Sequence, residues 1–165
     1  MRNWWIYLHI AGVLAFLGAH GVSMVVLYRI RHERDRAKIL TFITLSGETT
    51  LPMYVSLGVL VVAGAAAGIQ LHWFQGIPGD AMSSLWLWGS IAILLATVGL
   101  MTAIAKPYFN RIKAACEVRP TGVPRVADEE LDQILTSGKA HLISAIGGGG
   151  LLAILYLMLF KPGVG

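Results

Sequence analysis

The chain has 165 residues, of which 56% are hydrophobic and only 13% are charged, whereas soluble domains carry about 25% charged residues. A water-soluble domain of this size could not hide so many apolar side chains, because its surface is large relative to its volume. The net charge of +4 comes from basic residues that flank hydrophobic segments, which indicates membrane topology and not nucleic-acid binding. We therefore expect an integral membrane protein with a single domain over residues 1–165.

Four apolar stretches follow one another along the chain and predict four transmembrane helices. Each has about 20 or more residues, enough to cross a hydrocarbon layer about 30 Å thick. Hydrophobicity does not alternate with a period of two, so we expect helices and not strands. The first stretch is also too long for the core of a cleavable signal sequence. The expected spans are residues 4–28, 51–73, 85–105 and 141–160.

The connections between the spans predict how the helices are oriented. The first and third connections, residues 29–50 and 106–140, hold 11 of the 13 lysines and arginines, and residues 70–84 hold none. Basic loops stay in the cytoplasm, and tryptophans favour the membrane interfaces. All five tryptophans fall at the opposite, outer ends of the spans. We therefore expect an all-α, four-transmembrane-helix antiparallel bundle with both termini outside.

The two basic connections are expected to contain helices of their own. Residues 29–50 read as an extension of the first helix, a turn and a second helix, with Pro52 bending the start of the next span. In the third connection, Asp128 is expected to cap a short amphipathic helix that runs to Leu135. Four residues are expected to interrupt this connection, namely Pro107, Pro120, Gly122 and Pro124.

Small residues predict close helix packing in the spans. Gly64 and Gly68 form a GxxxG pair, and the fourth span carries the run Gly147–Gly150. Small residues let helices approach closely in lipid, within the chain or against another subunit. Four adjacent glycines destabilise a helix by roughly 0.5–1 kcal/mol each relative to alanine. A tight helix crossing or a flat porphyrin against the bare backbone would offset this cost.

Histidines are the residues in or near the spans that could carry chemistry. His9 and His20 lie eleven residues apart on one helix, so they face the same way about 16 Å apart. His72 shares the outer level with His9, and His141 lies in the inner half with His20, although nearer the cytoplasm. Imidazole is the usual axial ligand of b-type haem. The alternative is that a histidine only donates a hydrogen bond to a neighbouring helix.

Other candidate groups are weaker. Glu48 lies just before the second span and is either a proton carrier or partner for a basic residue, or a carboxylate at a helix start. Met24 lies one turn from His20 and leaves copper open as a bound metal. The single Cys116 excludes covalent haem attachment through a cysteine pair. No Walker, HExxH or GxSxG motif occurs, so the sequence assigns no catalytic reaction.

The segments Tyr7-Leu8-His9-Ile10-Ala11-Gly12 and Gly18-Ala19-His20-Gly21 resemble the first helix of small bacterial integral membrane proteins of unknown function. That group is similar to the copper-resistance D (CopD) membrane domain and to the four-helix cytochrome b family. Lys161-Pro162 after the last span is similar too. The resemblance implies the bacterial cytoplasmic membrane and a haem or copper site at His9 and His20.

Three functions are therefore expected as alternatives. The first is a membrane protein that binds haem b through His9 and His20, with His72 and His141 as opposite ligands, and passes electrons between a quinone and a redox partner. The second is a non-catalytic subunit that packs against a larger membrane complex through its small-residue faces. The third is copper handling.

Overall fold

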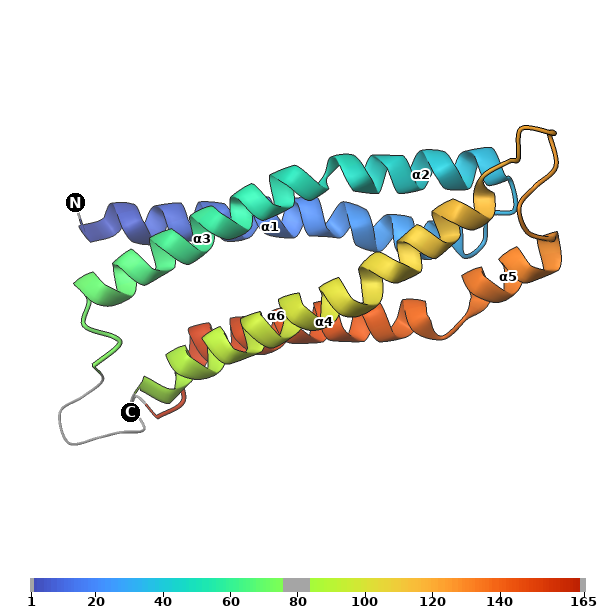
Figure 1. The fold of residues 1–165 in the computed structure, drawn as a ribbon. Coiled ribbons are helices and arrows are strands. Elements are labelled where there is room, and N and C mark those ends of the chain that lie inside the picture. The colour runs from blue at the N-terminus through green and yellow to red at the C-terminus, as the bar shows by residue number, and fades with distance from the viewer. Residues whose placement is uncertain (1, 76–83, 164–165) are drawn as a thin grey trace.

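A computed structural model describes residues 2–75 and 84–163, except for the side chains of Arg2 and Asn3. Within these residues the regular elements are all helices (Figure 1). Four helical stretches are long and apolar enough to cross a membrane, which confirms the expected class of all-α protein with four candidate spans. The six helices are α1 (Arg2–Ile30), α2 (Arg36–Glu48), α3 (Thr50–Gln70), α4 (Leu85–Cys116), α5 (Asp128–Thr136) and α6 (Lys139–Phe160).

The helices form two pairs that lie side by side. α1 packs mainly against α3, and α4 packs mainly against α6 (Figure 1). α1 begins and α6 ends at the same end of the molecule, where Trp73 contacts Trp86 and Phe74 contacts Trp88. We call this the aromatic end. The opposite end, formed by residues 29–38 and 106–140, is called the basic end.

Glycine permits the close approach of α1 and α3. A Cβ added to Gly12 would lie 2.9 Å from the backbone nitrogen of Leu60, and one added to Gly64 would lie 2.7 Å from Nδ1 of His9. Gly68 is in similarly close contact with Phe74. Both members of the GxxxG pair are therefore used within the chain, as packing in lipid favours.

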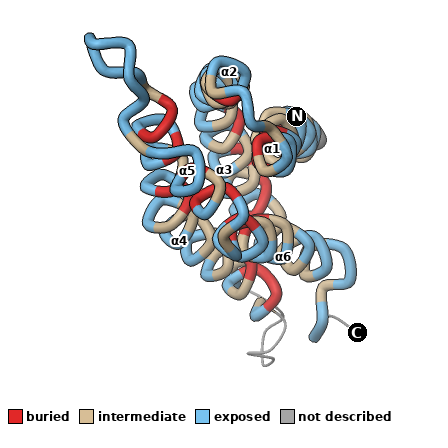
Figure 2. Tube along the Cα trace, turned by 90° about the vertical axis from the view of Figure 1, so that its right-hand side faces the viewer, coloured by how far each residue is buried: buried red, intermediate tan, exposed pale blue. Residues whose placement is uncertain are grey.

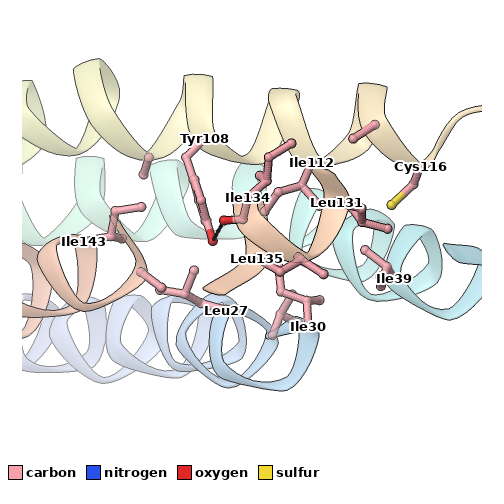
Figure 3. Packing of buried hydrophobic residues seen from close by; sticks show 14 residues of the cluster. Leu27, Ile30, Ile39, Tyr108, Ile112, Cys116, Leu131, Ile134, Leu135 and Ile143 are labelled. Atoms are coloured by element: carbon pink, nitrogen blue, oxygen red, sulfur yellow. Dashed lines mark hydrogen bonds between the residues drawn. The ribbon is translucent and has the colours of Figure 1, made fainter. Parts of the chain in front are cut away.

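The cluster of buried hydrophobic residues lies at the basic end, while Ala63, Ala67, Trp86 and Leu87 are buried nearer the aromatic end. Figure 2 shows buried residues confined to short stretches of the trace. The cluster takes side chains from α1, α2, α4, α5 and α6. Figure 3 shows them meeting around Tyr108, which donates a hydrogen bond to the Ile134 carbonyl. Within the spans, by contrast, Leu14, Leu95 and Leu152 are at least 65% exposed. The most deeply buried members of the cluster are Leu27, Ile30, Ile39, Ile112, Cys116, Leu135, Ala140 and Ile143.

This distribution follows from the two solvents of a membrane protein. Apolar side chains in a span can face hydrocarbon, so little is gained by burying them. Side chains beyond the hydrocarbon face water, where burial contributes about 25 cal/mol per Å² of apolar area. The cluster at the basic end is thus the part of the molecule that the hydrophobic effect stabilises.

Arg36 fastens α2 to the second helix pair at the basic end. Its Nη1 donates to the Ala115 carbonyl at 2.6 Å, and its Nη2 donates to the Val126 carbonyl at 2.9 Å and to Oδ1 of Asp128 at 2.7 Å. The side chain is only 14% exposed. Such charge-assisted hydrogen bonds are stronger than neutral ones, so Arg36 fixes the end of α4 and the start of α5 to α2.

The turn before α2 is held by carboxylates. Asp35 caps the helix by accepting hydrogen bonds from the Ala37 and Lys38 amides. The Asp35 and Arg34 amides donate to the exposed Glu33 carboxylate, and these bonds hold the pKa of Glu33 below its usual value. Both carboxylates thereby satisfy backbone donors that a turn or a helix start leaves open.

Three local expectations are refined by the structure. The disturbance expected at Pro52 takes the form of a boundary at Thr49, because Pro52 has no N–H to donate to the Glu48 carbonyl. The prediction that Pro107 interrupts a loop is wrong, since Pro107 lies inside α4. Buried residues beyond Pro107, among them Tyr108 and Ile112, hold α4 together to Cys116.

The expected cap of the short helix is also shifted by one residue. Ala127 is the N-cap of α5 and Asp128 is its first helical residue. Asp128 pairs with Arg36 instead of capping its own helix.

We expect Gly12→Ala to destabilise the protein by about 1–3 kcal/mol, because the added methyl group meets the backbone of Leu60 and forces α1 and α3 apart. Gly18→Ala is the matched control on the same helix, since nothing lies within 4 Å of its added Cβ. That control should be neutral or stabilising by up to about 1 kcal/mol. Unfolding in mixed detergent micelles measures both, and equal stability of the two variants would contradict the packing of α1 on α3.

Candidate functional site

A cavity of about 720 Å³ lies between the two helix pairs. Its walls come from α1, α2 and α3 on one side and from α4 and α6 on the other. The volume falls within the range of about 300–1,000 Å³ that is typical of small-molecule and cofactor sites. Leucines, isoleucines, methionines and phenylalanines form much of the wall, and His20 is the histidine that lines it.

His20 lines this cavity and carries a buried ring nitrogen without a partner in the described part of the chain. Its Nε2 is buried and has no hydrogen-bond partner among the described residues. The ring is stacked on Phe16 at 5.7 Å between centroids, with an interplanar angle of 8°. A buried polar atom without a partner is rare in proteins and calls for an explanation. A missing ligand is one such explanation.

Gly147 of α6 faces this nitrogen. A Cβ added to Gly147 would lie 3.3 Å from Nε2 of His20 and 3.5 Å from Cε of Met101. Counting residues from the ends of the first and fourth spans predicts that His20 and the glycine run share a level, and this contact confirms it. Gly150 faces Thr97 of α4, whereas Gly148 and Gly149 have nothing within 4 Å. Two of the four glycines thus allow close packing, and Gly147 leaves a bare backbone beside the imidazole.

His9 is engaged with the neighbouring helix. Its Nδ1 lies 2.7 Å from the Leu60 carbonyl oxygen, and the ring rests against Gly64. A carbonyl oxygen can only accept, so Nδ1 carries the proton and donates. The bond joins α1 to α3. This is the alternative stated above, in which a histidine donates a hydrogen bond to a neighbouring helix. Metal-bound histidines commonly donate in the same way from their second nitrogen, so the bond also leaves Nε2 of a neutral ring as a potential ligand.

His72 ends α3. It follows the C-cap residue Leu71 and adopts the left-handed backbone conformation, with φ of 58°. The next amide, Trp73, donates to the Gly68 carbonyl at 2.9 Å, as is usual where a helix ends in a left-handed residue. The His72 side chain is exposed. This geometry gives His72 a role in the chain reversal.

His141 and His32 lie at the basic end. The ring of His141 contacts Tyr28 of α1 at 6.2 Å between centroids, and its side chain is largely exposed. His32 is exposed in the turn after α1. The ring contacts found in the described chain join histidines to Phe16 and Tyr28, and none joins two histidines.

Two groups of cavity residues escaped the sequence analysis. Met53 and Met101 are far apart in the sequence, yet both line the cavity together with His20 and with Met24, which the sequence had placed one turn from His20. Lys106, Asn110 and Lys113 were treated as loop residues, although they continue α4 and line the cavity as well. Their spacing of four and three residues was a helical signal, hidden by the assumption that Pro107 ends the helix. Glu48 of α2 lies in the same wall.

Comparisons with known proteins add no assignment. No protein-family model matches the chain, and no curated protein or solved structure is detectably similar to it. Within the described residues, no group of three or more histidine, cysteine, aspartate or glutamate side chains could hold a metal ion. The case for function therefore depends on the cavity and its residues.

We expect His72→Gly to unfold at the same temperature as the unmodified protein or at a higher one. The left-handed conformation costs a side-chain-bearing residue about 1–2 kcal/mol, and glycine adopts it freely. The control is Gln70→Gly, the last residue of α3, which should destabilise by up to about 1 kcal/mol. A large loss of stability in His72→Gly would show that the imidazole itself is needed.

Proposed function

We propose that the protein binds b-type haem in the cavity beside His20 and takes part in quinone-linked electron transfer within a membrane. The observation that carries this proposal is the buried Nε2 of His20, which has no partner among the described residues and belongs to a ring that lines a cavity of about 720 Å³. Neutral imidazole binds haem iron without placing a charge in hydrocarbon.

The residues around His20 fit such a group. Gly147 offers bare backbone beside Nε2, and Met101 supplies a thioether at the same level. Methionine can serve as the second axial ligand of a haem. α1 makes few contacts with α6, so the two helix pairs can separate locally to admit a flat group. Haem bound there would supply one-electron chemistry, while the apolar wall would exclude water from it.

The other histidines have different places in this proposal. His9 holds α1 against α3 through the Leu60 carbonyl and remains a candidate ligand through Nε2. His72 and His141, both exposed, are weaker candidates for opposite ligands. One axial histidine at His20 is the arrangement that the packing favours.

We further propose an antiparallel bundle in a bacterial cytoplasmic membrane, with the basic end in the cytoplasm and both termini outside. The concentration of lysine and arginine in the connections 29–50 and 106–140 supports this orientation. The gathering of aromatic side chains at the other end supports it as well.

Copper handling is a second candidate, because one observation favours it. Met24, Met53 and Met101 line the cavity that His20 also lines. Thioether and imidazole ligands suit Cu(I). The exposed glycines Gly58 and Gly99 have no neighbour within 4 Å of an added Cβ. Another subunit could pack closely against them, so an accessory subunit of a larger complex remains a further proposal.

The absorption spectrum of the protein purified in neutral detergent tests haem against copper. We expect a Soret band and reduced-minus-oxidised bands in the visible region, and we expect His20→Ala to lose them. His32→Ala is the control, because His32 is exposed in a turn outside this cavity. Copper by metal analysis without porphyrin would favour the second candidate. A spectrum unchanged in His20→Ala would contradict the assignment of the ligand.

A further inference from the structure

Lys106, Asn110 and Lys113 lie on one face of α4. At about 100° per residue, Asn110 is turned about 40° from Lys106, and Lys113 about 20° in the opposite sense. All three line the cavity between the helix pairs. The same helix contributes Leu94 and Val98 farther toward the aromatic end. Along α4, the cavity wall therefore changes from apolar to cationic as it approaches the basic end.

The ammonium groups of Lys106 and Lys113 are available to bind an anionic ligand. Neither Lys106 nor Lys113 forms an ion pair within 4.0 Å in the described structure, nor does the Asn110 amide take part in a hydrogen bond there. Four other basic residues at this end are paired with carboxylates. These pairs are Arg34 with Asp132, Arg36 with Asp128, Lys38 with Asp35 and Arg125 with Glu117. Five more also form no ion pair within 4.0 Å in the described structure but do not line the cavity, namely Arg29, Arg31, Arg111, Arg119 and Lys139.

The cavity wall carries a net positive charge. Among its described residues, Glu48 is the one carboxylate, set against the ammonium groups of Lys106 and Lys113. Lysine stems can lie along apolar surface while the ammonium group reaches a polar boundary. A ligand that matches this wall has an apolar body and an acidic group at one end.

We propose that Lys106, Asn110 and Lys113 form an anion subsite, which holds the carboxylate of an amphiphilic ligand whose apolar body lies toward His20. This inference rests on the proposed function in one respect, which is that a ligand occupies the cavity. The acid group is supplied by the propionates of a porphyrin or by the head of a fatty acid. Asn110 donates its amide N–H to the carboxylate, and the two lysines contribute charge-assisted hydrogen bonds.

The test compares ligands that differ only in their acid group. Fe(III) protoporphyrin IX and its dimethyl ester are titrated into the full chain in a neutral detergent, followed by absorption. The double variant Lys106→Gln/Lys113→Gln should weaken binding of the free acid by about three- to tenfold, because both lysines are solvent-accessible. Binding of the ester should not change. Lys139→Gln, which alters a lysine outside the cavity wall, is the control.

Glu48→Gln should change the affinity for the free acid in the opposite direction. Removing the carboxylate should strengthen binding of the free acid while leaving the ester unaffected, because only the acid is repelled by Glu48. Equal effects of the double lysine variant, or of Glu48→Gln, on acid and ester would overturn the subsite.

A second pair of probes separates this inference from haem binding. If the porphyrin does not bind, oleate and methyl oleate are compared in the same variants by displacement of a fluorescent fatty acid. A lysine-dependent preference for oleate would uphold the subsite while the haem proposal fails. Equal binding of oleate and its ester, or no binding of either together with no porphyrin binding, would overturn the subsite as well.

Discussion

The two helix pairs are joined firmly at one end only, and the rest of the structure depends on this asymmetry. At the basic end, aliphatic side chains from five helices form a buried cluster, and Arg36 bridges α2 to the end of α4 and the start of α5. Along the spans, each pair is packed within itself, and α1 makes few contacts with α6. In hydrocarbon no hydrophobic driving force brings the two pairs together, because lipid contacts can replace contacts between side chains. A cavity between the pairs is the consequence.

The aromatic end closes the molecule by a different kind of contact. The Lys161 ammonium group lies 4.6 Å from the ring centroid of Trp73 and 5.3 Å from that of Trp86. Such cation–π contacts contribute roughly 0.5–2 kcal/mol, much less than a buried core. The pairs are thus held more loosely at this end than at the basic end.

The sequence predicted the helices well and the site only in part. Hydropathy is a property of each segment alone, so the four spans and the short helix near residues 128–135 could be found without tertiary information. Counting residues from the span ends also placed His20 at the level of Gly147, because helices rise uniformly. The roles of the histidines could not be found in this way. The left-handed conformation of His72 and the bond from His9 to Leu60 depend on how neighbouring segments pack.

The extension of α4 into the basic end is the main feature that the sequence did not predict, and the reason is physical. Proline and glycine in residues 106–140 favoured a loop, yet tertiary packing of Tyr108 and Ile112 outweighs the missing hydrogen bond at Pro107. Once α4 is extended, Lys106, Asn110 and Lys113 fall on one face and reach the cavity. The free energy gained by burying the side chains of the cluster thus exceeds the local preference of proline to end a helix.

The state of the histidine rings tests the central claim most directly. It can be measured by ¹⁵N NMR of the histidine-labelled protein in lipid nanodiscs. We expect His9 to carry its proton on Nδ1, hydrogen-bonded to the Leu60 carbonyl, and His20 to show an Nε2 resonance without a protein partner. Addition of Fe(III) protoporphyrin IX should perturb His20 and leave the hydrogen bond of His9 intact. An Nε2 of His20 that is hydrogen-bonded to another residue of the chain would contradict the claim that a ring beside the cavity has a free imidazole nitrogen.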